Sequence, residues 1–99
     1  AQSGYPWWQP FVWLFTALTE IAARHAVVVV AGLLERASEA TRVRNTVVAV
    51  SAAGRLAVYR KLHLYDAFGQ RESDWVEPGE LEAPETFEVR GIRFGMQTC

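Results

Sequence analysis

Cysteine and histidine are scarce in this 99-residue chain, which contains one Cys and two His. The single thiol, Cys99, cannot form an internal disulfide, so we expect a reducing, cytoplasmic compartment. His25 and His63 are too few to build a zinc site by themselves. These shortages argue against a disulfide-stapled domain and against a histidine-based zinc protein.

An excess of one charge and a long apolar run are also missing. Ten Lys and Arg residues face eleven Asp and Glu residues, a net charge of −1, whereas a nucleic-acid-binding surface needs an excess of basic residues. The longest apolar run, Ala26–Leu34, is much shorter than the roughly 20 residues that cross a bilayer. We expect neither a nucleic-acid nor a membrane partner. The 51% hydrophobic content instead predicts one globular domain over residues 1–99.

Local patterns predict one helix and several strands. Apolar residues at three- and four-residue steps predict an amphipathic helix over Phe11–His25. Val27–Val30 is an unbroken β-branched run, which predicts a strand buried on both faces, with Leu33–Arg36 continuing it toward solvent. The other predicted elements are a loop over Ala37–Arg44, a hairpin of Asn45–Ser51 and Leu56–Lys61, an irregular stretch over Leu62–Glu80, and a hairpin of Thr86–Val89 and Ile92–Thr98 that turns at Arg90-Gly91.

These elements predict an α+β fold class, with a mixed or antiparallel sheet and one main amphipathic helix. Open sheet edges invite pairing with another chain, and exposed apolar clusters mark interfaces. We therefore expect a homo-oligomer, reached most simply by a two-fold exchange of the helix. The alternative is a compact monomer whose aromatic residues cover its own sheet. The β-prone segments concerned are Val27–Val30, Val47–Val50 and Ile92–Met96, and the aromatic residues are Trp7, Trp8, Phe11, Trp13 and Phe15.

Three residues are candidates for chemistry. Lys61 ends a predicted strand, Glu72 lies in the following loop, and Cys99 ends an apolar strand. A thiol can be a nucleophile if a base removes its proton and a cation stabilises the developing oxyanion. Residue type alone favours plainer roles, because a strand-end Cys is usually a small hydrophobic side chain and a strand-end Lys is usually solvated.

Several segments, in order, resemble the carbon–nitrogen hydrolase (nitrilase) superfamily, amidase-like branch. Tyr59–Leu64 resembles its lysine motif, Gln70–Ser73 resembles the loop that carries its second glutamate, and Gly91–Cys99 resembles the strand that delivers its catalytic cysteine. The resemblance covers essentially the whole chain. Three further segments stand in the family's order: Ser3–Trp8, Asn45-Thr46 and Glu77–Gly79.

The resemblance implies an α-β-β-α sandwich and a thiol-dependent hydrolysis of small linear amides or nitriles, without a metal or an organic cofactor. It implies that Cys99 is the nucleophile, that Lys61 stabilises the oxyanion, and that Glu72 is a carboxylate that supports the site from outside the reacting groups or orients the substrate. Tyr65 and Phe68 are expected to wall the substrate pocket. The loop that carries them suggests ω-amides or substrates like deaminated glutathione.

One departure from the family pattern is important. The family's general base is a glutamate in an apolar-Pro-Glu motif upstream of the lysine, whereas the Pro-Glu pair here, Pro84-Glu85, follows Lys61. We therefore expect the chain to correspond to the part of a hydrolase between its first catalytic glutamate and its cysteine, and to be inactive by itself. The alternative is a non-catalytic, selected fragment that folds by self-association.

Overall fold

A computed structural model describes residues 9–39 and 41–99, with side chains from Trp13 onward. The predicted contributions of Trp7, Trp8 and the Phe11 side chain therefore lie outside the described part. The helices and strands follow one another in the order α1 (Gln9–His25), β1 (Val29–Arg36), β2 (Val43–Ser51), β3 (Gly54–Arg60), β4 (Asp66–Ala67), β5 (Gln70–Arg71), η1 (Glu72–Asp74), β6 (Thr86–Val89) and β7 (Ile92–Gly95).

Helix α1 confirms the helix predicted from the apolar spacing. Its residue Ala22 is fully buried against the sheet, and its small side chain allows close packing. Arg24 and His25 lie in the last turn, where positive charge suits the carbonyl end of a helix. The next residue, Ala26, has φ 52, and the chain then turns into β1. Within the described ranges, no helix is long and apolar enough to cross a membrane.

Strands β1, β2 and β3 form an antiparallel sheet with β2 in the centre. The β2–β3 hairpin was predicted, and β2 begins two residues earlier than expected, at Val43. The prediction that Val27–Val30 is buried on both faces is wrong. Strand β1 is an edge strand that alternates between half-buried and exposed residues, and Val30 is 54% exposed. A β-branched run is compatible with either position, because periodicity does not show how many neighbours a strand has.

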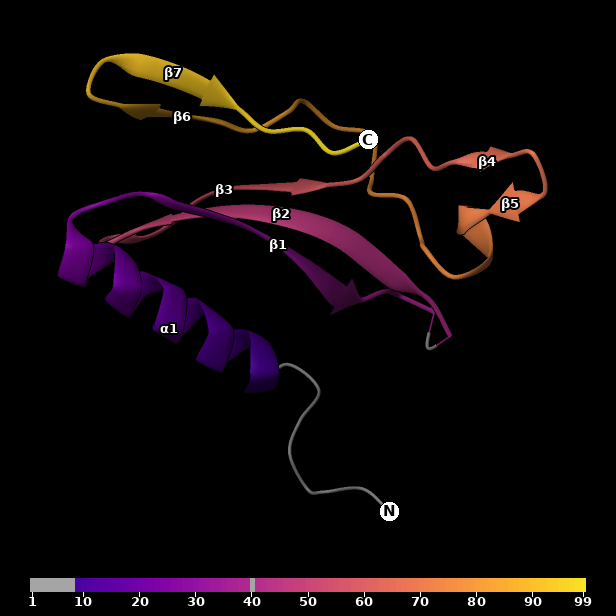
Figure 1. The fold of residues 1–99 in the computed structure, drawn as a ribbon, viewed down its shortest axis with the longest axis horizontal. Coiled ribbons are helices and arrows are strands. Elements are labelled where there is room, and N and C mark those ends of the chain that lie inside the picture. The colour runs from indigo at the N-terminus through magenta and orange to yellow at the C-terminus, as the bar shows by residue number, and fades with distance from the viewer. Residues whose placement is uncertain (1–8, 40) are drawn as a thin grey trace.

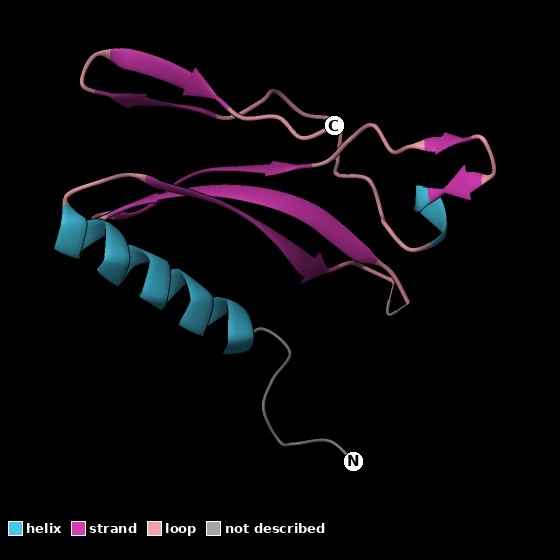
Figure 2. Ribbon diagram, in the orientation of Figure 1, coloured by secondary structure: helices cyan, strands magenta, loops and turns pink. Residues whose placement is uncertain are grey.

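The β6–β7 hairpin packs over the sheet on the side opposite α1 (Figure 1). Phe87 of β6 contacts a buried pair of alanines, Ala49 and Ala57, which face each other across β2 and β3. Its ring stacks on Phe94 of β7 with 5.5 Å between the centroids. Arg90 and Gly91 both have positive φ, as a two-residue hairpin turn requires. The order helix, sheet, hairpin confirms the α+β class (Figure 2).

The stretch Leu62–Glu80, predicted to be irregular, contains a small lobe made of β4, β5 and η1. The lobe extends beyond the end of β3 (Figure 1). Its two-residue strands turn through Phe68 and Gly69, both with positive φ. After the lobe, the chain returns along β2, where Val76 forms a parallel bridge with Val43. This return places the lobe beside the end of β3.

Candidate active site

Lys61 is fixed immediately after the last residue of β3. Its backbone N–H donates to the carbonyl of Asn45 at 2.8 Å, and its carbonyl accepts the N–H of Gly79 at 2.9 Å. The Lys61 side chain is only 6% exposed, unlike the solvated lysine that is usual at the end of a strand. A buried ammonium needs a charged partner, because its desolvation is otherwise costly.

Glu72 provides that partner. Both of its carboxylate oxygens lie 3.0 Å from Lys61 Nζ, and Oε1 also accepts the backbone N–H of Tyr65 at 2.7 Å. The Tyr65 N–H and then the Lys61 ammonium hold the pKa of Glu72 below its usual range, against the opposing effect of burial. The Glu72 side chain is therefore an ionised carboxylate at neutral pH.

Backbone geometry of the lobe brings Glu72 to this position. The Asp66 carboxylate accepts the N–H of Ser73 at 3.0 Å, which ties the start of β4 to η1. Ser73 accordingly lowers the pKa of Asp66. The N–H of Glu72 donates to the carbonyl of Tyr65 at 3.1 Å. The lobe is thus closed by local hydrogen bonds that present the Glu72 carboxylate to Lys61.

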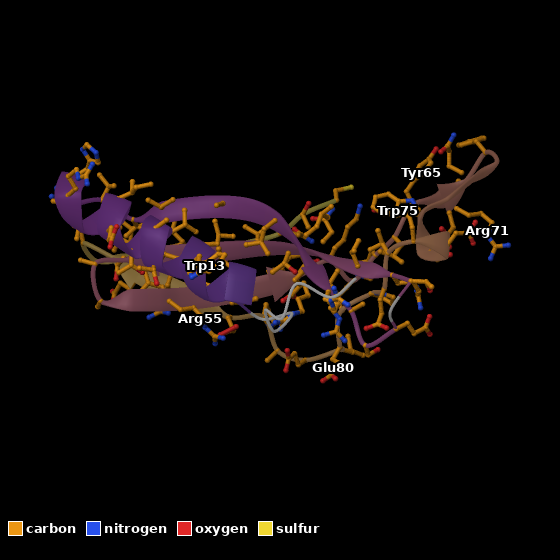
Figure 3. All side chains as sticks on the ribbon, turned by 90° about the horizontal axis from the view of Figure 1, so that it is seen from below. Trp13, Arg55, Tyr65, Arg71, Trp75 and Glu80 are labelled. Atoms are coloured by element: carbon orange, nitrogen blue, oxygen red, sulfur yellow. The ribbon has the colours of Figure 1, made fainter. Side chains whose placement is uncertain are left out.

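The predicted pocket residues Tyr65 and Phe68 are both exposed, Phe68 by 94%. Figure 3 shows Tyr65 on the lobe together with Arg71 and Trp75. Neither Tyr65 nor Phe68 lines the cavity next to β3 or the cavity at the end of α1. The contact that Tyr65 makes to the pair comes from its backbone amide, which residue type could not have predicted. Their role in a pocket stays a prediction.

Two of the cavities among the described residues lie next to β3 and next to the end of α1. The first, of about 580 Å³, lies between the end of β3, the connection to β6 and the residues after β7. It brings Leu62 and His63, beside Lys61, to the same cavity as Met96 and Gln97, which precede Cys99. The second is lined by the end of α1, the start of β1 and the β6–β7 hairpin.

Cys99 is an exposed free thiol. Lys61, Glu72 and Cys99 are not among the lining residues of the first cavity, so it shows only that chain neighbours of Lys61 and of Cys99 come together. No group of three or more His, Cys, Asp or Glu side chains within residues 9–39 and 41–99 could hold a metal ion.

A second ion pair fixes the end of β3 from the helix side of the sheet. Arg60 donates to the carboxylate of Glu35 on β1, and the buried Thr46 hydroxyl on β2 donates to the same oxygen at 2.7 Å. The Glu35 carboxylate, through its hydrogen bond and charge, raises the pKa of Arg60. This network joins all three strands one residue before Lys61. No local pattern predicts this network, because Glu35 on β1 lies 25 residues from Arg60 along the chain.

Comparison with known proteins identifies the family. The model of the carbon–nitrogen hydrolase family matches residues 2–99. The chain belongs to the carbon–nitrogen hydrolase family. A deaminated glutathione amidase of Escherichia coli O157:H7 is 47% identical over 58 residues, which are 59% of this chain and 22% of that protein. A hydrolase of Mycobacterium tuberculosis is 38% identical over 82 residues, which are 80% of this chain and 28% of that protein.

This carbon–nitrogen hydrolase chain thus spans about a quarter of the length of these curated relatives. Family membership confirms the resemblance found in the sequence. Of the three predicted catalytic residues, the structure brings Lys61 and Glu72 into contact. The assignment of Cys99 to the same site stays a prediction.

Proposed function

We propose that this chain supplies Lys61, Glu72 and Cys99 to the thiol-dependent hydrolysis of small linear amides. One observation carries the proposal: a lysine ammonium, shielded from water, is held at 3.0 Å by a single carboxylate at the end of β3. Such a charge is already in place before a reaction begins, so little reorganisation is needed when an oxyanion develops nearby. The first cavity supports the inclusion of Cys99, since both segments reach it.

The proposed reaction passes through a thioester. The Cys99 thiolate attacks the amide carbon, and the carbonyl oxygen becomes an oxyanion that the Lys61 ammonium stabilises. The C–N bond then breaks, and ammonia leaves with the proton that the thiol gave up, which the family's glutamate base, unmatched in this sequence, would take from Cys99 and return to the leaving nitrogen. Water hydrolyses the thioester and regenerates the thiol. Glu72 holds the Lys61 side chain in place, and the Glu72 carboxylate is itself bound by Lys61 Nζ and by the Tyr65 N–H.

The chain itself is proposed to be inactive toward amides. Its sequence has no match to the family's apolar-Pro-Glu base motif upstream of Lys61. An amide needs that proton transfer twice, at attack and at departure of the amine, and loss of one member of a catalytic group usually costs several orders of magnitude in rate. We expect ammonia release from a glutaramate-type amide at the level of the Cys99→Ser variant. Turnover that disappears only in the serine variant would contradict this.

An activated ester isolates the step that the chain can perform. A p-nitrophenyl ester of a small dicarboxylic monoamide needs no protonated leaving group, so Cys99 should become acylated with a stoichiometric release of nitrophenolate. Lys61→Met should slow this acylation by about 10²-fold, the usual loss for one oxyanion donor. Intact mass spectrometry locates the acyl group, and Cys99→Ser should abolish it.

The matched control is Arg71→Met, which removes an exposed cation from the same lobe. It should leave the acylation rate unchanged. If Lys61→Met and Arg71→Met acylate equally fast, Lys61 is not an oxyanion stabiliser, and the non-catalytic alternative is favoured.

The substrate class and the setting are part of the same proposal. Small linear amides, such as ω-amides, are favoured because a relative that is 47% identical over 58 residues is named a deaminated glutathione amidase. A cytoplasmic location is favoured by the exposed, unpaired Cys99 thiol. A homo-oligomer is favoured by edge strand β1, where Val30 and Leu34 are 54% and 58% exposed.

A further inference from the structure

One short backbone segment touches both members of the Lys61–Glu72 pair. This segment, residues 75–79, begins where η1 ends. Its first two N–H groups, those of Trp75 and Val76, donate to the Glu72 carbonyl at 3.1 and 2.9 Å. At its other end the N–H of Gly79 donates to the Lys61 carbonyl at 2.9 Å. The segment 75–79 therefore joins the backbone of Glu72 to the backbone of Lys61.

The middle of this segment is attached to the sheet at Val43, the first residue of β2. The N–H of Val43 donates to the Trp75 carbonyl at 2.9 Å, and the N–H of Glu77 donates to the Val43 carbonyl at 2.8 Å. Arg42 adds a bond from Nη2 to the Val76 carbonyl at 2.9 Å. These bonds attach the segment to the first residue of the central strand, which pairs with both β1 and β3.

The Glu77 side chain locks this attachment. Its carboxylate accepts the Ser38 hydroxyl at 2.6 Å and the Ser38 N–H at 3.4 Å. It also accepts Arg44 Nε at 3.0 Å and forms an ion pair with Arg44 Nη2 at 2.8 Å. The Glu77 side chain is 12% exposed, and the Ser38 hydroxyl is the main cause that lowers its pKa. One carboxylate thus joins segment 75–79 to the β1–β2 connection and to β2.

We infer that Glu77 is a positioning residue for the Lys61–Glu72 pair, acting through segment 75–79. The importance of this role for catalysis rests on the proposed function. Glu77 does not share a hydrogen bond with Lys61 or Glu72 among the described contacts; it holds the segment whose two ends bond to their carbonyls. Small displacements of catalytic groups have large effects, since about 1 Å can cost on the order of 100-fold in rate.

The test is Glu77→Gln, which keeps the shape of the side chain and removes its charge. The readout is the titration of the Glu72 carboxyl carbon, followed by nuclear magnetic resonance of the whole chain. In the wild type the pKa of Glu72 lies below the usual range because of the Tyr65 N–H and Lys61. In Glu77→Gln we expect it to rise toward the ordinary value, because the pair is no longer held at its present distance.

The matched control is Glu88→Gln, an exposed glutamate on β6 that lines neither of the two cavities. It removes the same charge and should leave the Glu72 titration unchanged. A purely structural role for Glu77 would lower the free energy of unfolding without changing the Glu72 titration, and that result would overturn the inference. If Glu77→Gln does not fold, Ser38→Ala removes one donor to Glu77 and should shift the Glu72 titration in the same direction. An unchanged titration there would equally overturn it.

The ester acylation rate separates this inference from the proposed function. Glu77→Gln should slow acylation of Cys99 by on the order of 10-fold or more, and Glu88→Gln should not. If the wild type shows no acylation while Glu77→Gln still shifts the Glu72 titration, the proposed function fails and the positioning role stands. If acylation occurs but the Glu72 titration is the same in both chains, the positioning role fails alone.

Discussion

Removing the Glu72 charge should destabilise the chain more than removing the Lys61 charge. In Glu72→Gln the Lys61 ammonium stays in a site where its side chain is 6% exposed, without a carboxylate. Breaking a buried ion pair by removing one partner costs about 3–5 kcal/mol. The amide oxygen of Gln can still accept one hydrogen bond, which restores about 1 kcal/mol. We therefore expect Glu72→Gln to lower the free energy of unfolding by about 2–4 kcal/mol at pH 7.

Lys61→Met is expected to cost less. The methionine retains most of the buried aliphatic contacts of the lysine. The Glu72 carboxylate keeps its hydrogen bond from the Tyr65 N–H at 2.7 Å, and the Glu72 side chain, at 13% exposed, is closer to water than that of Lys61. A loss of about 1–2 kcal/mol is expected. The double variant should be more stable than Glu72→Gln alone, because it no longer buries an unpaired ammonium.

Acid should remove the contribution of Glu72. Its pKa in the folded chain is lowered relative to the unfolded chain. Its stabilisation is therefore complete above the ordinary glutamate pKa and is lost as the pH falls through the lowered, folded value. The difference between wild type and Glu72→Gln should shrink over this range.

Urea unfolding followed by tryptophan fluorescence measures these values for all four chains, at one protein concentration. The reasoning is refuted if Glu72→Gln lies within about 0.5 kcal/mol of the wild type at pH 7. It is also refuted if the double variant equals the sum of the two single variants, since residues in contact should couple.

Two further predictions concern the backbone and the sheet edge. Gly79→Ala would place a Cβ atom 2.7 Å from the Arg60 carbonyl oxygen, so it should destabilise the chain by about 1–3 kcal/mol in a thermal melt. The control is Gly95→Ala, whose Cβ would lie 3.9 Å from Thr86 and which should change the stability little. The wild type should behave as a dimer or larger in light scattering across a dilution series, and Val30→Lys with Leu34→Lys should return it to 11.1 kDa. A wild type of 11.1 kDa at every concentration would contradict the second prediction.

The elements that sequence could predict are those with a strong local signal. The helix α1 follows from an apolar stripe, and the β6–β7 turn follows from the Arg90-Gly91 pair. Both signals lie in residues that are close together in the sequence. The lobe was missed because its strands have two residues each and turn at Phe68, where an aromatic residue adopts positive φ. The exposure of Val30 was missed because a β-branched run does not show whether a neighbouring strand exists.

The candidate site was predictable only through the family resemblance. Residue type favoured a solvated Lys61, and no local pattern indicates that Glu72 approaches it across the lobe. The role inferred for Glu77 was beyond the sequence because its partners, Ser38 and Arg44, lie 39 and 33 residues away. Contacts over such separations depend on the folded topology rather than on periodicity.

The central claim is that Cys99 shares one site with Lys61 and Glu72. Since Cys99 is the only cysteine, a thiol-specific nitroxide labels it without any substitution, and its paramagnetic broadening can be read at each backbone amide. Broadening between copies is identified in a mixture of two chains. One carries the nitroxide but no isotope enrichment, and the other is isotope-enriched but carries no nitroxide. Within one chain, the account predicts strong broadening at Lys61, Leu62 and Glu72 and weak broadening along α1, on the opposite face of the sheet (Figure 1). Unbroadened Lys61 and Glu72 signals, or stronger broadening in α1, would contradict it.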